Sequence, residues 1–488
     1  MNSHTILREK TTTGVIWSFL QQLLRNGIQV VTTLILAWFL VPEDFGLMAM
    51  ISVFFTIANS LMDSGFTQAL IRKKEVSQTD YSTAFYTNLL LGLLAYALLF
   101  ISAPFIANFY SEPRLVMLVR VVGLVVIINS FQMVQVADLT RRLNFKIQFN
   151  VTLPAALLSG VIAISMAVMG FGVWSLVAQM LVLALTSTVL YWFVNKWRPS
   201  REFSVESLRE MFGFGSKLLL SGLINTVYTN LYVIVIGKFF SATQVGYYYF
   251  ALQIESLLVS QLTGAIHDVS YPSLATLQDD DITLKLFYRK IIQMVSYIVF
   301  PCMIALAVLA EPLFHLLLKA DWWPAVPYLQ LLCVVGLFYP LHVINLNILK
   351  VKGRSDLFLY LEIIKVIINV IILFICIPYG IFAILIGQIG LSVLAFIPNS
   401  YFSIKLIDYS AHEQLRDLIP PLLVATAMGF FMYAQGLIMP FNGFVYILVV
   451  GFSGILFYMI LNYLLKIPGQ LMLHQIIKEK YPVENKHE

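Results

Sequence analysis

Arg25 lies in the middle of a long apolar segment, GVIWSFLQQLLRNGIQVVTTLILAWFL, that runs from residue 14 to residue 40. A guanidinium group carries several N–H donors in one plane, which suits it to the oxygens of a phosphate or a carboxylate. On a helix, Gln21, Gln29 and Thr32 would share the face of Arg25. The chemistry available to this polar stripe is therefore the binding of an anion that also carries hydrogen-bonding groups.

The segment around Arg25 is long enough to cross a membrane as one helix. Its 27 residues would span about 40 Å, against about 30 Å for the hydrocarbon core of a bilayer. An arginine at the centre of a bilayer costs at least about 2.5 kcal/mol. We therefore expect the polar stripe to face a water-filled cavity in which Arg25 meets an anionic group.

The composition places the whole chain in a membrane. Of its 488 residues, 59% are hydrophobic and only 12% are charged, which excludes an ordinary soluble domain. The first apolar segment is too long for a signal peptide, so we expect the chain to retain it. Fourteen candidate spans follow one another, at residues 14–40, 45–70, 81–102, 115–137, 149–169, 173–194, 211–237, 245–268, 288–310, 325–349, 357–377, 380–402, 418–438 and 443–465.

The loops between these spans differ in charge. Most of the 31 lysines and arginines lie in alternate loops, on one side of the membrane. Positively charged loops stay in the cytoplasm, so both termini are expected to be cytoplasmic. The net charge of +5 follows from this arrangement and gives no support to nucleic-acid binding.

The chain also repeats itself. When each residue is set against the residue 200 positions later, LILAWFLVPEDFGLMAM aligns with IVIGKFFSATQVGYYYF, and Gly46 aligns with Gly246. We predict an all-α polytopic fold of two six-helix lobes related by a pseudo-twofold axis, plus two C-terminal helices. The expected lobes are residues 1–200 and 201–410, and the helix pair and tail are residues 411–488. Two such repeats are typical of alternating-access transporters that hold a ligand between them.

Other spans carry polar faces of their own. Span 211–237 has a stripe that includes Lys217, Asn225, Tyr228 and Tyr232, and span 45–70 has one that includes Asn59. We expect these faces to line the cavity. Small and hydroxylated residues also join helices to one another in lipid, and that alternative stays open.

The remaining buried charges have two interpretations each. Lys365 could attract an anion, or it could form a local ion pair with Glu362, three residues earlier. Four acidic or histidine side chains are candidates for coupling transport to protons or sodium, and three of them could instead be charges at helix ends. These candidates are Glu255, Asp63, His267 and Asp268.

Catalytic and metal-binding motifs are missing from the sequence. No GxxxxGK[ST], HExxH, GxSxG or CxxC motif occurs, and the three cysteines lie far apart. We therefore expect no catalytic residue, no metal and no cofactor. Without a nucleotide site, the energy for transport would come from an ion gradient or from consumption of the product.

Several short motifs resemble the Wzx-type bacterial polysaccharide exporters, in particular the branch of the colanic acid exporters. This group belongs to the superfamily of multidrug and toxin extrusion transporters and lipid II flippases. One departure is Trp38, in Leu36-Ala37-Trp38, where the family often has arginine. The motifs are LVPEDFGLMAM, DSGFTQALIRKKEVSQTDYSTAFYTNL, GFGVWSLVAQ, WRPS, FGSKLLLSGL, VIGKFFSATQVGYY and INLNILKVKGRSDLF.

This resemblance implies a fourteen-helix flippase of the bacterial inner membrane. Its substrate would be an undecaprenyl-diphosphate-linked oligosaccharide, and its partners would include the lipid bilayer, glycosyltransferases and a polysaccharide polymerase. Candidates for binding the diphosphate are Arg25, Lys217 and Lys365. Candidates for binding the glycan are Gln21, Gln29, Asn59, Asn225, Tyr228 and Tyr232.

Two other functions are compatible with the hydropathy of the chain. One is a cation-coupled multidrug exporter of the same superfamily, although a central arginine disfavours cationic cargo. The other is a membrane polysaccharide polymerase or ligase. Such enzymes usually need a large loop on the outer face, and the candidate spans leave no room for one.

Overall fold

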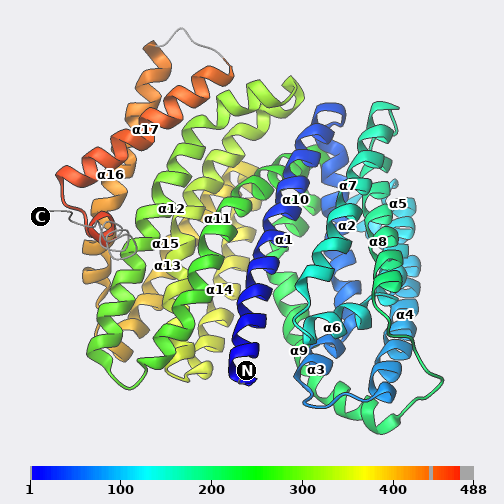
Figure 1. Cartoon of the computed structure of the whole chain (residues 1–488). Helices are drawn as coiled ribbons and strands as arrows, with labels where there is room; N and C mark the ends of the chain where they lie inside the picture. The colour runs from blue at the N-terminus through cyan, green and yellow to red at the C-terminus, as the bar shows by residue number, and fades with distance from the viewer. Residues whose placement is uncertain (1–2, 439–442, 473–488) are drawn as a thin grey trace, which may run out of the picture. The chain divides into compact units, whose positions relative to one another are not determined.

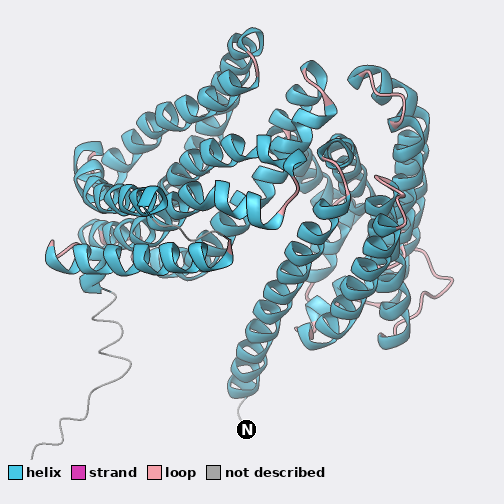
Figure 2. Ribbon diagram, turned by 90° about the horizontal axis from the view of Figure 1, so that it is seen from above, coloured by secondary structure: helices cyan, strands magenta, loops and turns pink. Residues whose placement is uncertain are grey.

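The computed structural model describes residues 3–438 and 443–472, and within them every regular element is a helix (Figures 1 and 2). The α-helices are α1 (Ser3–Phe39), α2 (Pro42–Asp63), α3 (Phe66–Arg72), α4 (Gln78–Tyr110), α5 (Leu115–Ser130), α6 (Met133–Arg141), α7 (Phe145–Val168), α8 (Trp174–Val194), α9 (Val205–Thr229), α10 (Leu231–Phe239), α11 (Ala242–Thr276), α12 (Asp281–Leu317), α13 (Val326–Val351), α14 (Ser355–Cys376), α15 (Ile381–Ile407), α16 (Ala411–Ile438) and α17 (Phe444–Leu464). Two short 3₁₀ helices are η1 (Ala320–Ala325) and η2 (Ile377–Tyr379).

The predicted all-α membrane fold is confirmed. Ten helices in the described residues are long and apolar enough to cross a bilayer, and the number is twelve if each of two bent pairs counts as one span. The bent pairs are α5 with α6, at 43°, and α9 with α10, at 48°. The two other expected spans coincide with α1 and α11, so the total of fourteen stays a prediction.

One bend has a local cause in the sequence. Between α9 and α10, the side-chain amide of Asn230 donates to the carbonyl of Thr226 at 2.9 Å. An asparagine that bonds its own backbone in this way competes with the helix ladder. The chain therefore changes direction at a polar residue inside an apolar span.

The chain forms two compact units, Met1–Tyr249 and Phe250–Glu488. The first unit contains α1 to α10 and the first turns of α11. Its boundary lies later than the end of the first sequence repeat, because α9 and α10 pack against α2 and α4. The lobe boundaries expected from the repeat therefore stay a prediction.

The repeat itself is visible in equivalent buried hydrogen bonds. In the first unit, the Tyr81 hydroxyl donates to Asp138 Oδ1 at 3.0 Å, across 57 residues. In the second unit, the Tyr288 hydroxyl donates to Asn345 Oδ1 at 2.6 Å, again across 57 residues. A matching bond at the same spacing in each half indicates that the two halves share one helical arrangement.

A pair of glycines allows two helices of the first unit to touch backbone to backbone. A Cβ atom on Gly46 of α2 would lie 1.8 Å from the carbonyl oxygen of Ala242, which begins α11. A Cβ atom on Gly246 would lie 1.8 Å from the carbonyl oxygen of Pro42. Only glycine fits at either position, and the close approach favours Cα–H···O contacts between the helices.

The replacement Gly46→Ala should destabilise the protein, because the new methyl group has no space. Alanine is otherwise the better helix former by about 1 kcal/mol, so a loss of stability would report the close contact. Gly213→Ala is the matched control, since nothing lies within 4 Å of a Cβ atom there. The measurement is the melting temperature of the purified protein in detergent. An unchanged or higher value for Gly46→Ala would contradict the contact.

Candidate functional site: a polar chamber beside α1

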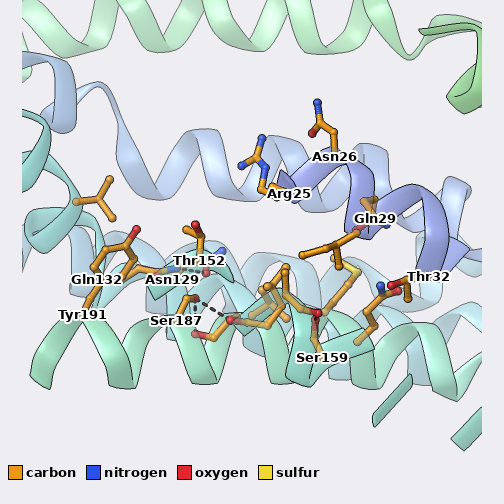
Figure 3. Close-up of a pocket in the computed structure, with 18 of the residues that line it drawn as sticks. Arg25, Asn26, Gln29, Thr32, Asn129, Gln132, Thr152, Ser159, Ser187 and Tyr191 are labelled. Carbon is orange, nitrogen blue, oxygen red and sulfur yellow. Dashed lines mark hydrogen bonds between the residues drawn. The ribbon is translucent and has the colours of Figure 1, made fainter. Parts of the chain in front are cut away.

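Arg25 lies at the mouth of a chamber of about 540 Å³ in the first unit (Figure 3). Its walls come mainly from α1, α5, α7 and α8, together with the break between α5 and α6. The polar residues that line it are Arg25, Asn26, Gln29, Thr32, Asn129, Gln132, Thr152, Ser159, Gln179, Ser187 and Tyr191.

Two contacts between α1 and α7 bracket this chamber. About two turns before Arg25, the ring of Trp17 lies 5.3 Å from that of Phe149. Further along, Thr32 is only 5% exposed and packs against Gly160, where a Cβ atom would lie 2.9 Å from the threonine hydroxyl. Arg25 falls between the two contacts. The small residue at position 160 thus brings α1 onto α7 while Arg25 stays exposed.

Arg25 is the one charged residue among those that line the chamber. None of the ion pairs found in the described residues includes it. The hydroxyl-bearing side chain of Tyr191 also lines the chamber. A cation at the edge of a neutral polar chamber attracts an anion, because no carboxylate among the lining residues neutralises it.

The opposite wall carries a chain of side-chain amides. Asn129 Nδ2 donates to Asn59 Oδ1 at 3.2 Å, and Gln132 Nε2 donates to Asn129 Oδ1 at 2.8 Å. Gln132 Oε1 is buried and has no hydrogen-bond partner. Buried polar atoms are normally satisfied, so this oxygen is available to a hydroxyl group or a water molecule in the chamber. The wall therefore suits a neutral, hydroxyl-rich ligand.

Three of the predicted α1 and α2 residues lie at or near this chamber. Arg25 and Gln29 line it, and Asn59 of α2 joins it through its hydrogen bond to Asn129. Gln21, one turn before Arg25, is partly exposed but does not line the chamber.

The predicted residues of α9 and α10 lie elsewhere in the first unit. Lys217 and Asn225 are exposed, and Tyr228 is partly exposed. Tyr232 is only 8% exposed, and its ring stacks with that of Tyr248 at 6.3 Å. None of the four lines the chamber, so their roles in binding stay predictions.

Lys365 lies in the second unit and already has a partner. Its Nζ is 2.9 Å from Glu362 Oε1, and the lysine is only 8% exposed. This is the local ion pair that the spacing offered as an alternative. A role for Lys365 in binding a diphosphate stays a prediction. In that role, its ammonium group would have to contact both Glu362 and the diphosphate.

Among the predicted coupling residues, the structure describes the side chains of Glu255 and Asp63. Glu255 of α11 is 8% exposed and packs on α13, where a Cβ atom on Gly336 would lie 2.7 Å from its Oε1. Asp63 Oδ1 accepts from the backbone N–H and the hydroxyl of Thr67, at 3.2 and 2.5 Å, and so orders the start of α3. The side chains of His267 and Asp268 lie outside the described residues. None of these roles is tested.

Most of the amide and hydroxyl wall could not be found in the sequence. Asn129 and Gln132 surround the break at the end of α5, and Gln179 is an isolated amide in an apolar span. In the sequence, these residues stand out only as side-chain amides within otherwise apolar spans. In the described residues, no three His, Cys, Asp or Glu side chains come together as a possible metal site.

Comparison with known proteins agrees with this architecture. Teichuronic acid biosynthesis protein TuaB of Bacillus subtilis (strain 168) is 27% identical over 390 residues, which cover 78% of this chain and 79% of TuaB. Lipopolysaccharide biosynthesis protein WzxC of Escherichia coli (strain K12) is 27% identical over 357 residues, which cover 72% of each chain.

A solved structure extends the likeness to the fold. The lipid II flippase MurJ, in an inward closed conformation, matches with a TM-score of 0.71 at 15% identity and covers 96% of this chain and 100% of that one. The family model described as polysaccharide biosynthesis protein matches residues 35–327, which is more than half of the chain. The chain therefore belongs to the family of polysaccharide biosynthesis proteins.

Proposed function

We propose that this protein moves an oligosaccharide linked to a polyprenyl diphosphate across the bacterial inner membrane by alternating access. The observation that carries the proposal is that Arg25, which has no ion-pair partner among the described residues, lines a chamber of neutral polar residues. The names of the relatives support it, since TuaB is a teichuronic acid biosynthesis protein, WzxC is a lipopolysaccharide biosynthesis protein and MurJ is a lipid II flippase. The proposed glycan is a repeat unit for such a polysaccharide.

The chamber offers the charged and hydrogen-bonding groups that this substrate would lack in the hydrocarbon core of a bilayer. A diphosphate headgroup carries about two negative charges and many hydroxyls, and its passage through bare hydrocarbon would cost tens of kcal/mol. Arg25 can hold phosphate oxygens with two parallel N–H bonds. The amides and hydroxyls of the opposite wall can replace the water around the sugars, while the polyprenyl chain stays in lipid.

The size of the chamber agrees with this role. Its volume of about 540 Å³ falls in the range of about 300–1,000 Å³ that is typical of small-molecule sites. It can accept part of a headgroup at a time. Transport of this kind forms and breaks no covalent bond, so the protein acts as a transporter and not as an enzyme.

The charge of the loops supports an orientation with both termini in the cytoplasm. The substrate would then enter from the side where glycosyltransferases build it and leave toward a polymerase. An ion gradient would supply the energy, with Glu255 as the best-placed coupling group because it is buried on α11 and packs on α13.

Replacement of Arg25 tests the proposal directly. Loss of two charge-assisted hydrogen bonds should slow transport in Arg25→Ala by about two orders of magnitude. Arg25→Lys should restore part of the activity, because lysine keeps the charge but not the paired donors. The measurement is the fraction of lipid-linked repeat units stranded on the inner leaflet of a deletion strain that expresses each variant.

Arg120→Ala is the matched control, since Arg120 stacks on the ring of Phe100 at 4.3 Å and does not line the chamber. It should export normally. Wild-type export by Arg25→Ala, at an equal amount of protein in the membrane, would refute the role of Arg25 and with it the proposed function.

The amide wall allows a second test, of glycan binding. Gln132→Met keeps the size of the side chain but removes its hydrogen bonds, so the substrate concentration for half-maximal transport should rise about tenfold. Gln135→Met is the control, because Gln135 also has a buried Oε1 without a partner but lies outside the chamber. The assay uses purified protein in vesicles with a lipid-linked oligosaccharide. Equal effects of the two variants would argue against glycan binding by this wall.

A further inference from the structure

The second unit contains a cavity that is larger than the Arg25 chamber and separate from it. Its volume is about 1000 Å³, and it lies between α12, α13, α16 and α17. The residues that line it come from the end of α12, the first turns of α13, the end of α16 and the start of α17. The cavity therefore lies at the opposite end of α12 from Lys285, Arg289 and Lys290, which belong to its first turns.

The walls of this cavity present acceptors and aromatic rings. Glu311 is the one acidic residue that lines it. Pro312, inside α12, has no N–H, so the carbonyl of Val308 lacks its donor within the helix. Tyr446 brings its hydroxyl against Gly436, where a Cβ atom would lie only 2.5 Å from that oxygen. One N–H of the Gln330 amide donates to the carbonyl of Ala307 at 3.2 Å, and the imidazole of His315 also lines the cavity.

A carboxylate, a carbonyl that lacks its i+4 donor and a tyrosine ring are groups that can bind an ammonium ion. The same carboxylate would repel a diphosphate that has no cationic group of its own, so this cavity does not suit the anionic cargo of the Arg25 chamber. Its ligand should carry an ammonium group with N–H donors. Such a ligand must also be able to reach the cavity.

The surroundings of the cavity are apolar and exposed. Tyr433, Leu437 and Phe444 are 61%, 74% and 64% exposed, and they belong to α16 and α17 around its edge. Both helices are long and apolar enough to cross a bilayer. Large apolar side chains exposed on such helices face lipid, so a ligand can enter this cavity from the membrane.

We propose that this cavity binds the headgroup of an amine-bearing phospholipid, of the phosphatidylethanolamine type. Glu311 and the carbonyl of Val308 accept hydrogen bonds from its ammonium group, and the ring of Tyr446 packs against it. The acyl chains lie along the exposed faces of α16 and α17. The proposal goes beyond the proposed function and does not depend on which cargo the protein carries.

The test compares three lipids on the purified full-length protein. Phosphatidylethanolamine is added in detergent, beside phosphatidylcholine, which has no N–H donors, and phosphatidylglycerol, which has no amine. The readouts are the melting temperature and the amount of each lipid retained in native mass spectra. Phosphatidylethanolamine should raise the melting temperature most and should be retained about tenfold over phosphatidylcholine.

Glu311→Gln should abolish this preference, whereas Glu206→Gln, which removes a carboxylate from the first turn of α9, should keep it. Equal stabilisation by the three lipids, or an unchanged preference in Glu311→Gln, would overturn the proposal. Equal stabilisation by soluble ethanolamine alone would overturn the assignment to a phospholipid. None of these readouts requires transport, so the result is separable from that of Arg25→Ala.

Discussion

The Arg25 chamber depends on one constraint: a guanidinium group without a counter-charge is stable only where water or an anion can reach it. A buried ion normally survives in a protein because a partner neutralises it, and Lys365 with Glu362 shows that solution in the second unit. Arg25 has no such partner among the described residues and is instead exposed to a chamber. Water or an anion must therefore stabilise this charge, and the chamber has room for either.

The neutral walls around Arg25 matter as much as its charge. A carboxylate in the chamber would lower the free-energy cost of burying the charge of Arg25. It would also form an ion pair with the guanidinium group and hold it in place. Amides and hydroxyls stabilise water and sugars by weaker bonds that exchange easily. A transporter has to release what it binds, so one strong contact surrounded by many weak ones suits repeated turnover.

Some of this architecture follows from the sequence, and some of it does not. The α1 stripe was predictable because the cost of Arg25 in lipid is a local property of one helix. The repeat was predictable because Gly46 and Gly246 align without a gap. The wall from Asn129 to Tyr191 was not, because the face that a helix turns inward depends on its neighbours. Tyr232 lies on the predicted stripe, yet it packs against Tyr248, which no pattern within its own helix could reveal.

The reciprocal contact of Gly46 and Gly246 has a consequence for the origin of the chain. Each glycine meets the carbonyl oxygen that lies four residues before the other, as the same residue does with itself across the axis of a symmetric homodimer. A gene for one half, joined to its own copy, would produce this contact without any new adaptation. The contact is therefore the one that two joined copies of a half would form, and each carbonyl leaves room only for glycine on the opposite helix.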